Sequence, residues 1–150
     1  MATGKREDPL TAYHFYVDLK TSGVLGYFRE CSGLSTESPV VEQKSADAKG
    51  MTIIHKVPGT LKFSDITLKR GMTSDDKIWK WRKKVEDGKV KDARTDGSIV
   101  LFDQNNGEVA RWNFIAGWPT KVSGPSLNAN GNDIAVEELV IAVEGLERKK

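Results

Sequence analysis

Few residues in this 150-residue chain are of the types that catalyse reactions or bind metals. It contains two histidines, His14 and His55, and one cysteine, Cys31. A structural zinc site takes four ligands, mostly from histidine and cysteine, so such a site lacks ligands here. The chain also lacks the G-x-S-x-G, G-x-x-x-x-G-K-[ST] and H-E-x-x-H motifs. We therefore expect no enzyme, no catalytic residue, no metal site and no cofactor.

The nearest approach to a catalytic pair is His14 with Asp18, on the polar face of an expected strand. At ~3.3 Å per residue the two lie ~13 Å apart, too far for proton transfer. Cys31 has no histidine or lysine beside it in sequence to activate it, so we expect a buried structural thiol. Residues 103–107 resemble the start of a calcium loop, but the glycine falls one position early and no glutamate follows at the required distance. We interpret this segment as a turn.

One basic segment carries tryptophans between its cations. Residues 77–84 read Lys-Ile-Trp-Lys-Trp-Arg-Lys-Lys. Such interleaving occurs in proteins that bind single-stranded nucleic acid or anionic membranes. It is also typical of an amphipathic helix with a solvated basic face, in which Trp81 joins an apolar stripe with Ile78 and Val85. Trp79 lies ~100° from this stripe, so we expect it to cover a second surface, by packing or by subunit contact.

Composition favours one soluble domain. The length suits a single domain over residues 11–150, after a flexible arm at residues 1–10. The net charge of +2, from 23 basic and 21 acidic residues, is too balanced to indicate a nucleic-acid partner. A single cysteine excludes an intrachain disulfide and fits a reducing compartment. The N-terminus lacks an apolar segment and no apolar run reaches ~18 residues, so we expect neither a signal peptide nor a transmembrane span.

Alternating apolar residues predict strands over most of the chain. Between residues 12 and 19, Phe15, Val17 and Leu19 lie on one face and polar side chains on the other. Residues 105–107, Asn-Asn-Gly, predict a tight hairpin turn between two further strands. The two strands that flank this turn are expected at residues 97–103 and 108–116. Further strands are expected at residues 24–31, 39–44 and 60–70.

One helix and one long loop interrupt the strands. Residues 74–86 are predicted to be helical, with Thr73 as N-cap and Gly88 as the stop. Residues 45–59 show little periodicity, and we read them as a long loop. Long loops in compact domains are usually functional or disordered, and the apolar residues in this one argue against disorder.

The segment 134–146 is the most apolar long stretch, and its composition suits a helix or a strand. As a strand it changes face at Glu137-Glu138, since Val136 lies on one side and Leu139 on the other. Residues 60–70 show a similar change, at Ser64-Asp65. Such a change marks a β-bulge or a strand that passes from one sheet to another. We favour the strand, and predict a mainly β fold: a small barrel or sandwich of about seven or eight strands with one helix at about 74–86.

Seven stretches follow one another in a specific order and spacing. They are FYV at 15–17, FRECSGL at 28–34, VPG at 57–59, ITLKRG at 66–71, tryptophans at 79 and 81, WPT at 118–120 and NDIAVEEL at 132–139. Together they resemble the tail tube proteins of contractile phage tails and of extracellular contractile injection systems, above all the inner tube proteins of the latter. The haemolysin-coregulated tube proteins of type VI secretion share the implied architecture and are more distant in sequence.

The resemblance implies an assembly. Subunits would form hexameric rings, and the rings would stack into a hollow tube that a contracting sheath propels and that carries or conducts cargo. The implied partners are further copies of the chain, a sheath protein, baseplate or hub and terminator proteins, and a cargo effector or tape-measure protein in the lumen. No specific nucleic acid is implied, although DNA would pass through a phage tube. Assembly would occur in the bacterial cytoplasm, before incorporation into a phage tail or a particle that is released.

The resemblance also implies contact residues. The long loop would reach the next ring, with candidate contacts at Asp47, Lys49, Met51, Ile53 and Lys56. Subunit contacts are further expected at Trp79, Glu137 and Glu138. Two other functions stay open at this point: a monomeric nucleic-acid-binding β domain that uses the basic tryptophan helix, and a small β-barrel enzyme or ligand carrier, which would need a pocket.

Overall fold

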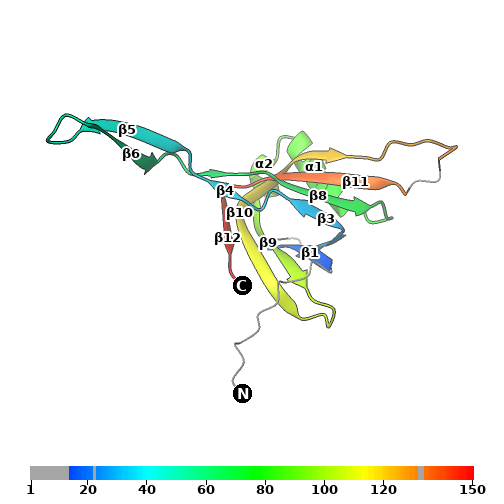
Figure 1. Cartoon of the computed structure of the whole chain (residues 1–150). Coiled ribbons are helices and arrows are strands. Elements are labelled where there is room, and N and C mark those ends of the chain that lie inside the picture. Colours follow the sequence, from blue (N-terminus) through cyan, green and yellow to red (C-terminus); the bar gives the residue numbers. More distant parts are fainter. Residues whose placement is uncertain (1–13, 22, 132–133) are drawn as a thin grey trace, which may run out of the picture.

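The computed structural model describes residues 14–21, 23–131 and 134–150. The arm expected at residues 1–10 lies outside this part of the chain. Within it the chain forms twelve strands and two helices (Figure 1). Eight of the strands make one open sheet. They are β1 (His14–Leu19), β2 (Gly23–Phe28), β3 (Glu30–Ser32), β8 (Ile66–Gly71), β9 (Thr95–Phe102), β10 (Glu108–Ser123), β11 (Val136–Ala142) and β12 (Gly145–Arg148).

The long strand β10 folds this sheet into two halves. Its first part pairs with β9 on one side and β12 on the other, and its last part pairs with β11. The register with β9 shifts between Phe114 and Gly117, where Ala116 has a φ of 53°. We call β2, β1, β9, β12 and the start of β10 the first half-sheet. The end of β10, with β11, β8 and β3, is the second half-sheet.

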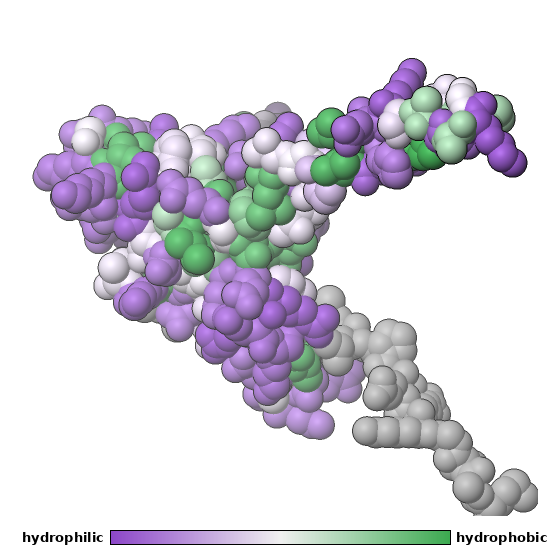
Figure 2. All heavy atoms as spheres, turned by 90° about the vertical axis from the view of Figure 1, so that its left-hand side faces the viewer, coloured by the Kyte–Doolittle hydropathy of each residue, from purple (hydrophilic) through white to green (hydrophobic). Residues whose placement is uncertain are grey.

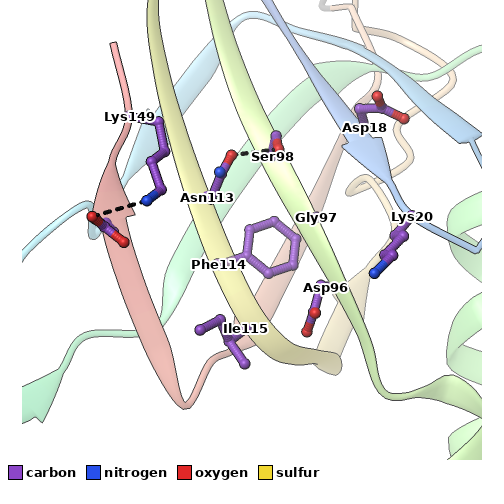
Figure 3. A pocket seen from close by; sticks show the side chains of 10 residues that line it. Asp18, Lys20, Asp96, Gly97, Ser98, Asn113, Phe114, Ile115 and Lys149 are labelled. Atoms are coloured by element: carbon purple, nitrogen blue, oxygen red, sulfur yellow. Dashed lines mark hydrogen bonds and ion pairs between the residues drawn. The ribbon is translucent and has the colours of Figure 1, made fainter.

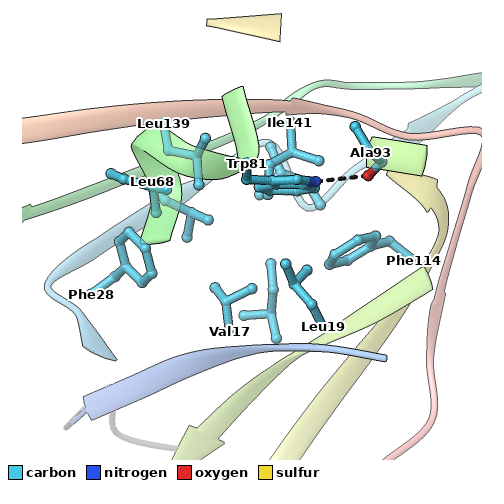
Figure 4. Packing of buried hydrophobic residues seen from close by; sticks show 12 residues of the cluster. Val17, Leu19, Phe28, Leu68, Trp81, Ala93, Phe114, Leu139 and Ile141 are labelled. Carbon is cyan, nitrogen blue, oxygen red and sulfur yellow. Dashed lines mark hydrogen bonds between the residues drawn. The ribbon is translucent and has the colours of Figure 1, made fainter. Parts of the chain in front are cut away.

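The core fills the space between the two half-sheets (Figure 4). Alternate positions of each strand point inward, because successive side chains of a strand face opposite sides. A buried aliphatic or aromatic side chain stabilises the fold by about 1.5–3 kcal/mol. The first half-sheet supplies Val17, Leu19, Ile99 and Phe114, and the second supplies Ile66, Leu68, Leu139 and Ile141.

Two helices close the core. Helix α1 (Lys77–Glu86) buries Ile78 and Trp81, as the predicted stripe requires. The short helix α2 (Val90–Ala93) follows, and the Trp81 indole N–H donates to the Ala93 carbonyl at 2.7 Å. The predicted start of the helix at residue 74 is wrong. Asp76 is the N-cap, and the Thr73 hydroxyl accepts a hydrogen bond from the Asp75 N–H in the preceding turn. Helix α2 escaped prediction because a single turn shows no periodicity.

Residues 40–58 form a projecting β-hairpin, which corrects the prediction of a loop at 45–59. Strands β5 (Val40–Ala46) and β6 (Thr52–Pro58) pair without a register break and extend away from the body (Figure 1). The turn is closed by Asp47, whose carboxylate accepts hydrogen bonds from the Lys49 and Met51 N–H groups, each at 2.8 Å. Between hairpin and body lies the short pair β4 (Thr36–Glu37) and β7 (Lys62–Phe63).

The two predicted changes of face have different outcomes. At Ser64-Asp65 the chain leaves the β4–β7 pair and enters the second half-sheet as β8, which confirms a strand passing between sheets. At Glu137-Glu138 the prediction is wrong. Strand β11 pairs with β8 without any shift, and Glu137 points inward beside Leu139. The prediction was wrong because it assigned the buried face from apolar residues alone, and Glu137 is a charged residue on that face.

The count of seven or eight strands was also too low. Residues 24–31 divide into β2, which pairs with β1, and β3, which pairs with β8. Strand β10 continues through Lys121 to Ser123, in a region predicted as loop. A proline within it, Pro119, lowered the predicted strand tendency. The mainly β fold is confirmed, as an open sheet rather than a closed barrel.

Candidate assembly surfaces

The hairpin is the first candidate surface, because every residue of β5 and β6 is exposed. Met51 is 65% exposed, and Ile53 and Ile54 are exposed on opposite faces of the hairpin. Seen from the hairpin side, apolar side chains lie among polar ones at the molecular surface (Figure 2). A two-stranded hairpin alone is marginally stable in water, so its apolar residues call for a covering surface.

All five residues predicted to contact a neighbouring ring lie on this hairpin. Asp47 and Lys49 are in its turn, Met51 follows the turn, and Ile53 and Lys56 belong to β6. The structure therefore brings the predicted set together on one projecting element. Asp47 has a structural task there, since its carboxylate holds the turn.

The outer face of the first half-sheet is the second candidate surface, and polar side chains predominate at one end of it. It carries a hollow of about 520 Å³ (Figure 3), lined by residues that include Asp18, Lys20, Ser98, Asn113 and Lys149. Ser98 donates a hydrogen bond to the Asn113 side-chain oxygen at 2.7 Å. Lys149 forms an ion pair of 3.1 Å with Glu147. Cations and carboxylates alternate on this face, so neither sign of charge dominates.

A second ion pair on the same face shifts two pKa values. The Arg111 Nε lies 2.7 Å from the Glu108 carboxylate. The hydrogen bond from Arg111 lowers the pKa of Glu108, and the same bond raises the pKa of Arg111. Both groups thus stay ionised and paired at neutral pH.

Aromatic rings cover the other end of this face. The His14 and Phe102 rings stack with centroids 5.2 Å apart, and Tyr16 stacks on Phe102 at 5.1 Å. Tyr27 meets Tyr16 edge to face at 5.8 Å. His14 is therefore one member of an aromatic cluster on this face.

Free strand edges form the third candidate surface. Among the described residues, β2 pairs only with β1 and β12 pairs only with β10, so both borders of the first half-sheet are open. An open edge presents unpaired backbone N–H and C=O groups to another chain. The two edges lie on opposite sides of one half-sheet, which permits a sheet that continues from subunit to subunit.

The three predicted subunit contacts lie in different surroundings. Glu137 is 1% exposed, and its carboxylate accepts hydrogen bonds from Arg70 Nε at 3.1 Å and from Trp79 Nε1 at 3.0 Å. It therefore holds β8, β11 and α1 together within the subunit. Trp79 is 37% exposed, and Glu138 is half-buried on the outer side of β11. A contact of these residues with another subunit stays a prediction.

Arg70 was missed by the sequence analysis, although a signal for it exists. It follows Ile66 and Leu68 at alternate positions of β8, and Glu137 precedes Leu139 and Ile141 in the same way. Opposite charges at the ends of two apolar rows predict a buried ion pair if the rows are neighbours.

The basic helix offers little for stacking nucleic-acid bases. Trp81 is buried, and the Trp79 N–H is bound to Glu137. Two of the cations, Lys80 and Lys83, form ion pairs with Asp76 and Asp87 at 3.4 and 3.3 Å. The geometry therefore favours packing of this helix over base stacking.

The described part of the chain has no group of three or more histidine, cysteine or acidic residues placed to hold a metal ion. Neither of its two helices is long and apolar enough to cross a membrane. Cys31 is partly buried against the core, where a buried thiol was predicted, and burial raises the pKa of its thiol to about 12.

An open β-sheet with free edges and a projecting hairpin defines this chain as a β-rich assembly subunit. The model of the family "T4-like virus tail tube protein gp19" matches residues 11–147. The chain therefore belongs to the tail tube protein family and is a structural subunit of a tube. This confirms the resemblance found in the sequence.

Solved structures agree with this assignment. A chain of the extracellular contractile injection system "PVC sheath-tube complex in extended state" is 26% identical, with 95% of this chain and 93% of that chain covered and a TM-score of 0.78. The tube-terminating cap of the anti-feeding prophage is 22% identical over 99% and 96%, with a TM-score of 0.79. Hcp1 from Flavobacterium johnsoniae is 14% identical over 91% and 95%, with a TM-score of 0.58. These last two show the fold alone. No curated protein sequence matches significantly.

Proposed function

We propose that this chain forms six-membered rings that stack into the inner tube of a contractile injection particle or phage tail. A chain of similar fold occurs in an anti-feeding prophage baseplate described as 6-fold symmetrised. The 26% identical chain occurs in a sheath–tube complex. The observation that carries the proposal is the exposed hairpin, since its apolar residues need a second molecule to cover them.

The first half-sheet lines the channel. Its two open edges let β2 of one subunit pair with β12 of the next, so that six half-sheets close into one barrel and no edge stays exposed. The helices close the core between the two half-sheets and cannot continue a sheet. The polar face with Asp18, Ser98 and Asn113 then meets the aqueous lumen.

The remaining partners follow from this orientation. The sheath surrounds the side of the tube that faces away from the channel. A baseplate or hub closes one end of the tube and a terminator protein the other, and cargo or a tape-measure protein occupies the lumen. Residues 11–150 act as one tube domain, with residues 1–10 as an arm near a ring junction. The subunit works without catalysis or cofactor, and it assembles in the cytoplasm before the particle is completed.

Electron microscopy of the purified chain tests the proposal. We expect rings of uniform diameter and stacked tubes. The variant Met51→Asp plus Ile53→Asp should give rings that stack poorly, because two carboxylates would be buried at the ring junction. The control Lys84→Asp plus Lys91→Asp places two carboxylates on the helices and should leave tube length unchanged.

Two results would contradict the proposal. One is a wild-type chain that stays monomeric at high concentration and shifts DNA in a salt-sensitive manner, which would favour the nucleic-acid-binding alternative. The other is equal tube length for the hairpin variant and the wild type, which would exclude the hairpin as the ring-to-ring contact.

A further inference from the structure

The open edge of the first half-sheet at β2 is irregular, because β2 contains a β-bulge. Val17 of β1 pairs with Gly26 of β2. The next residue of β1, Asp18, pairs with Val24, so the register skips Leu25. A bulge bends its strand and changes the direction of the backbone N–H and C=O groups around it. The direction of these groups at the open edge therefore depends on what holds the bulge in place.

The guanidinium group of Arg70 lies against this bulge. Arg70 is the last inward-facing residue of β8, in the second half-sheet, and it is buried. A Cβ at Gly26 would lie 2.6 Å from the Arg70 Nη1, which is closer than such atoms approach each other. The guanidinium thus occupies the space that a side chain at Gly26 would need, and the φ of 136° at Gly26 also favours glycine.

Contacts from other elements fix the position of this guanidinium. Its Nε donates to the Glu137 carboxylate of β11 at 3.1 Å, and its Nη2 donates to the Asp75 carbonyl at 3.2 Å. Its Cζ lies 5.3 Å from the centre of the Phe28 ring at the end of β2, a favourable cation–π distance. Arg70 is therefore anchored by β11 and by the segment before α1, and it presents a planar group to β2.

The bulge lies close to the point where the chain passes from the first half-sheet to the second. Phe28 ends β2, the Arg29 N–H donates to the Lys69 carbonyl at 2.9 Å, and β3 then pairs with β8. Within the described part of the chain, β1 is the one strand that pairs with β2. Arg70 gives the bulge a second support, which comes from the other half-sheet.

We propose that Arg70 is a positioning residue for ring closure, because its guanidinium holds the bulge of β2 in the shape that pairs with β12 of the next subunit. The inference rests on the proposed function, and it names a residue that acts on the lateral contact from inside the subunit. An edge that already has its paired shape loses less conformational entropy on association. Loss of the guanidinium therefore weakens ring formation more than it weakens the folded subunit.

Replacement of the whole ion pair separates assembly from folding. Arg70→Met plus Glu137→Met fills the space with apolar side chains, and such an exchange of a buried ion pair is often neutral for stability. We expect a wild-type unfolding midpoint in urea, but ring formation only at a protein concentration about tenfold higher. Sedimentation of a dilution series measures this concentration. Hydrogen–deuterium exchange should be faster in β2 than in the wild type and unchanged in β8 and β11.

Arg82→Met is the matched control for this variant. Arg82 lies on α1 and donates to the Pro119 carbonyl at 3.2 Å, so the control also removes a guanidinium and a hydrogen bond to a carbonyl. It should form rings at the wild-type concentration and leave exchange in β2 unchanged. A rise in the ring concentration equal to that of the double variant would overturn the specific role of Arg70.

A further variant, Arg70→Lys, keeps the inference testable if the double variant is unstable. Lysine retains a charge opposite Glu137 but lacks the planar group that lies against Gly26. We expect the same raised ring concentration and fast exchange in β2. Rings at the wild-type concentration from this variant, or exchange raised equally in β2, β8 and β11, would overturn the positioning role and leave the tube function intact. A wild-type chain that forms no rings would instead overturn the proposed function, and this inference with it.

Discussion

At the scale of single residues, the buried pair Arg70 and Glu137 joins three elements. Their side chains are 6% and 1% exposed. Arg70 also donates to the Asp75 carbonyl at 3.2 Å, and its guanidinium lies 5.3 Å from the centre of the Phe28 ring. Every buried side-chain nitrogen or oxygen of these two residues has a hydrogen-bond partner. A buried charge is tolerated under this condition.

Removing one partner of this pair should destabilise the subunit strongly. We expect Glu137→Ala to lower the free energy of unfolding by about 3–5 kcal/mol, because Arg70 would stay buried without its counter-charge. The neighbouring Glu138→Ala should change it by no more than about 0.5 kcal/mol. Urea denaturation of the two variants measures the difference. Equal losses would show that the buried ion pair does not hold these elements together.

Cys31 should make the stability of the subunit depend on alkaline pH. Burial raises the pKa of its thiol from 9.0 to about 12. The folded chain therefore keeps a proton that the unfolded chain loses, and this contribution is complete below pH 9 and disappears as the pH rises towards 12. We expect the free energy of unfolding to fall more steeply above pH 9 in the wild type than in Cys31→Ala. Parallel pH profiles for the two chains would contradict the assignment.

The two adjacent glutamates show what sequence can and cannot predict at this scale. Alternation in β11 fixes which residues share a face, so Glu137 could have been placed with Leu139 from the sequence. Its partner could not, because Arg70 lies 67 positions away and meets it only through the pairing of β8 with β11. Long-range pairing is set by the whole sheet and leaves no local pattern.

At the scale of elements, the bend of β10 depends on Ala116. Its φ of 53° lies in the left-handed region, which costs a residue other than glycine about 1–2 kcal/mol. The Asp96 carboxylate accepts a hydrogen bond from the Ala116 N–H at 2.9 Å and so holds the bend in place. This bend is the point at which one strand passes from the first half-sheet to the second.

Substitutions at this bend should act in opposite directions. Ala116→Gly should be neutral or raise the free energy of unfolding by up to about 1 kcal/mol, because glycine adopts positive φ without strain. Ala116→Val should lower it by at least about 1 kcal/mol, because a β-branched residue is a strong outlier there. Thermal unfolding of both variants provides the measurement. A destabilised glycine variant together with a tolerated valine would contradict this account.

Helix α1 and the hairpin show why prediction from sequence succeeded for one element and failed for most of another. The pattern of Ile78, Trp81 and Val85 predicted α1 because a helix buries one stripe. Residues 45–58 of the hairpin gave no pattern because both of its faces are exposed in the free subunit, and alternation arises only where one face is buried. A hairpin with two exposed faces therefore looks like a loop when its sequence is read alone.

At the scale of the whole molecule, body and hairpin should be separable. Replacing residues 43–55 by Asn-Gly keeps the base of the hairpin, where Glu42 pairs with Lys56, and closes it with a favourable turn. We expect the unfolding midpoint of the subunit to stay unchanged, because the removed residues are exposed and belong to no core cluster. Electron micrographs should show rings without long tubes. A large loss of stability would show that the hairpin belongs to the folding unit of the body.

The continuity of β10 has a mechanical consequence. Its sixteen residues form part of both half-sheets, the first of which lies on the channel side in our proposal. A tube pushed from one end experiences shear between its inner and outer layers. Where two layers are held by packing alone, side chains can slide past each other under load. With the first half-sheet lining the channel, as we propose, the same load would run along the covalent backbone of β10, and the two layers would advance together.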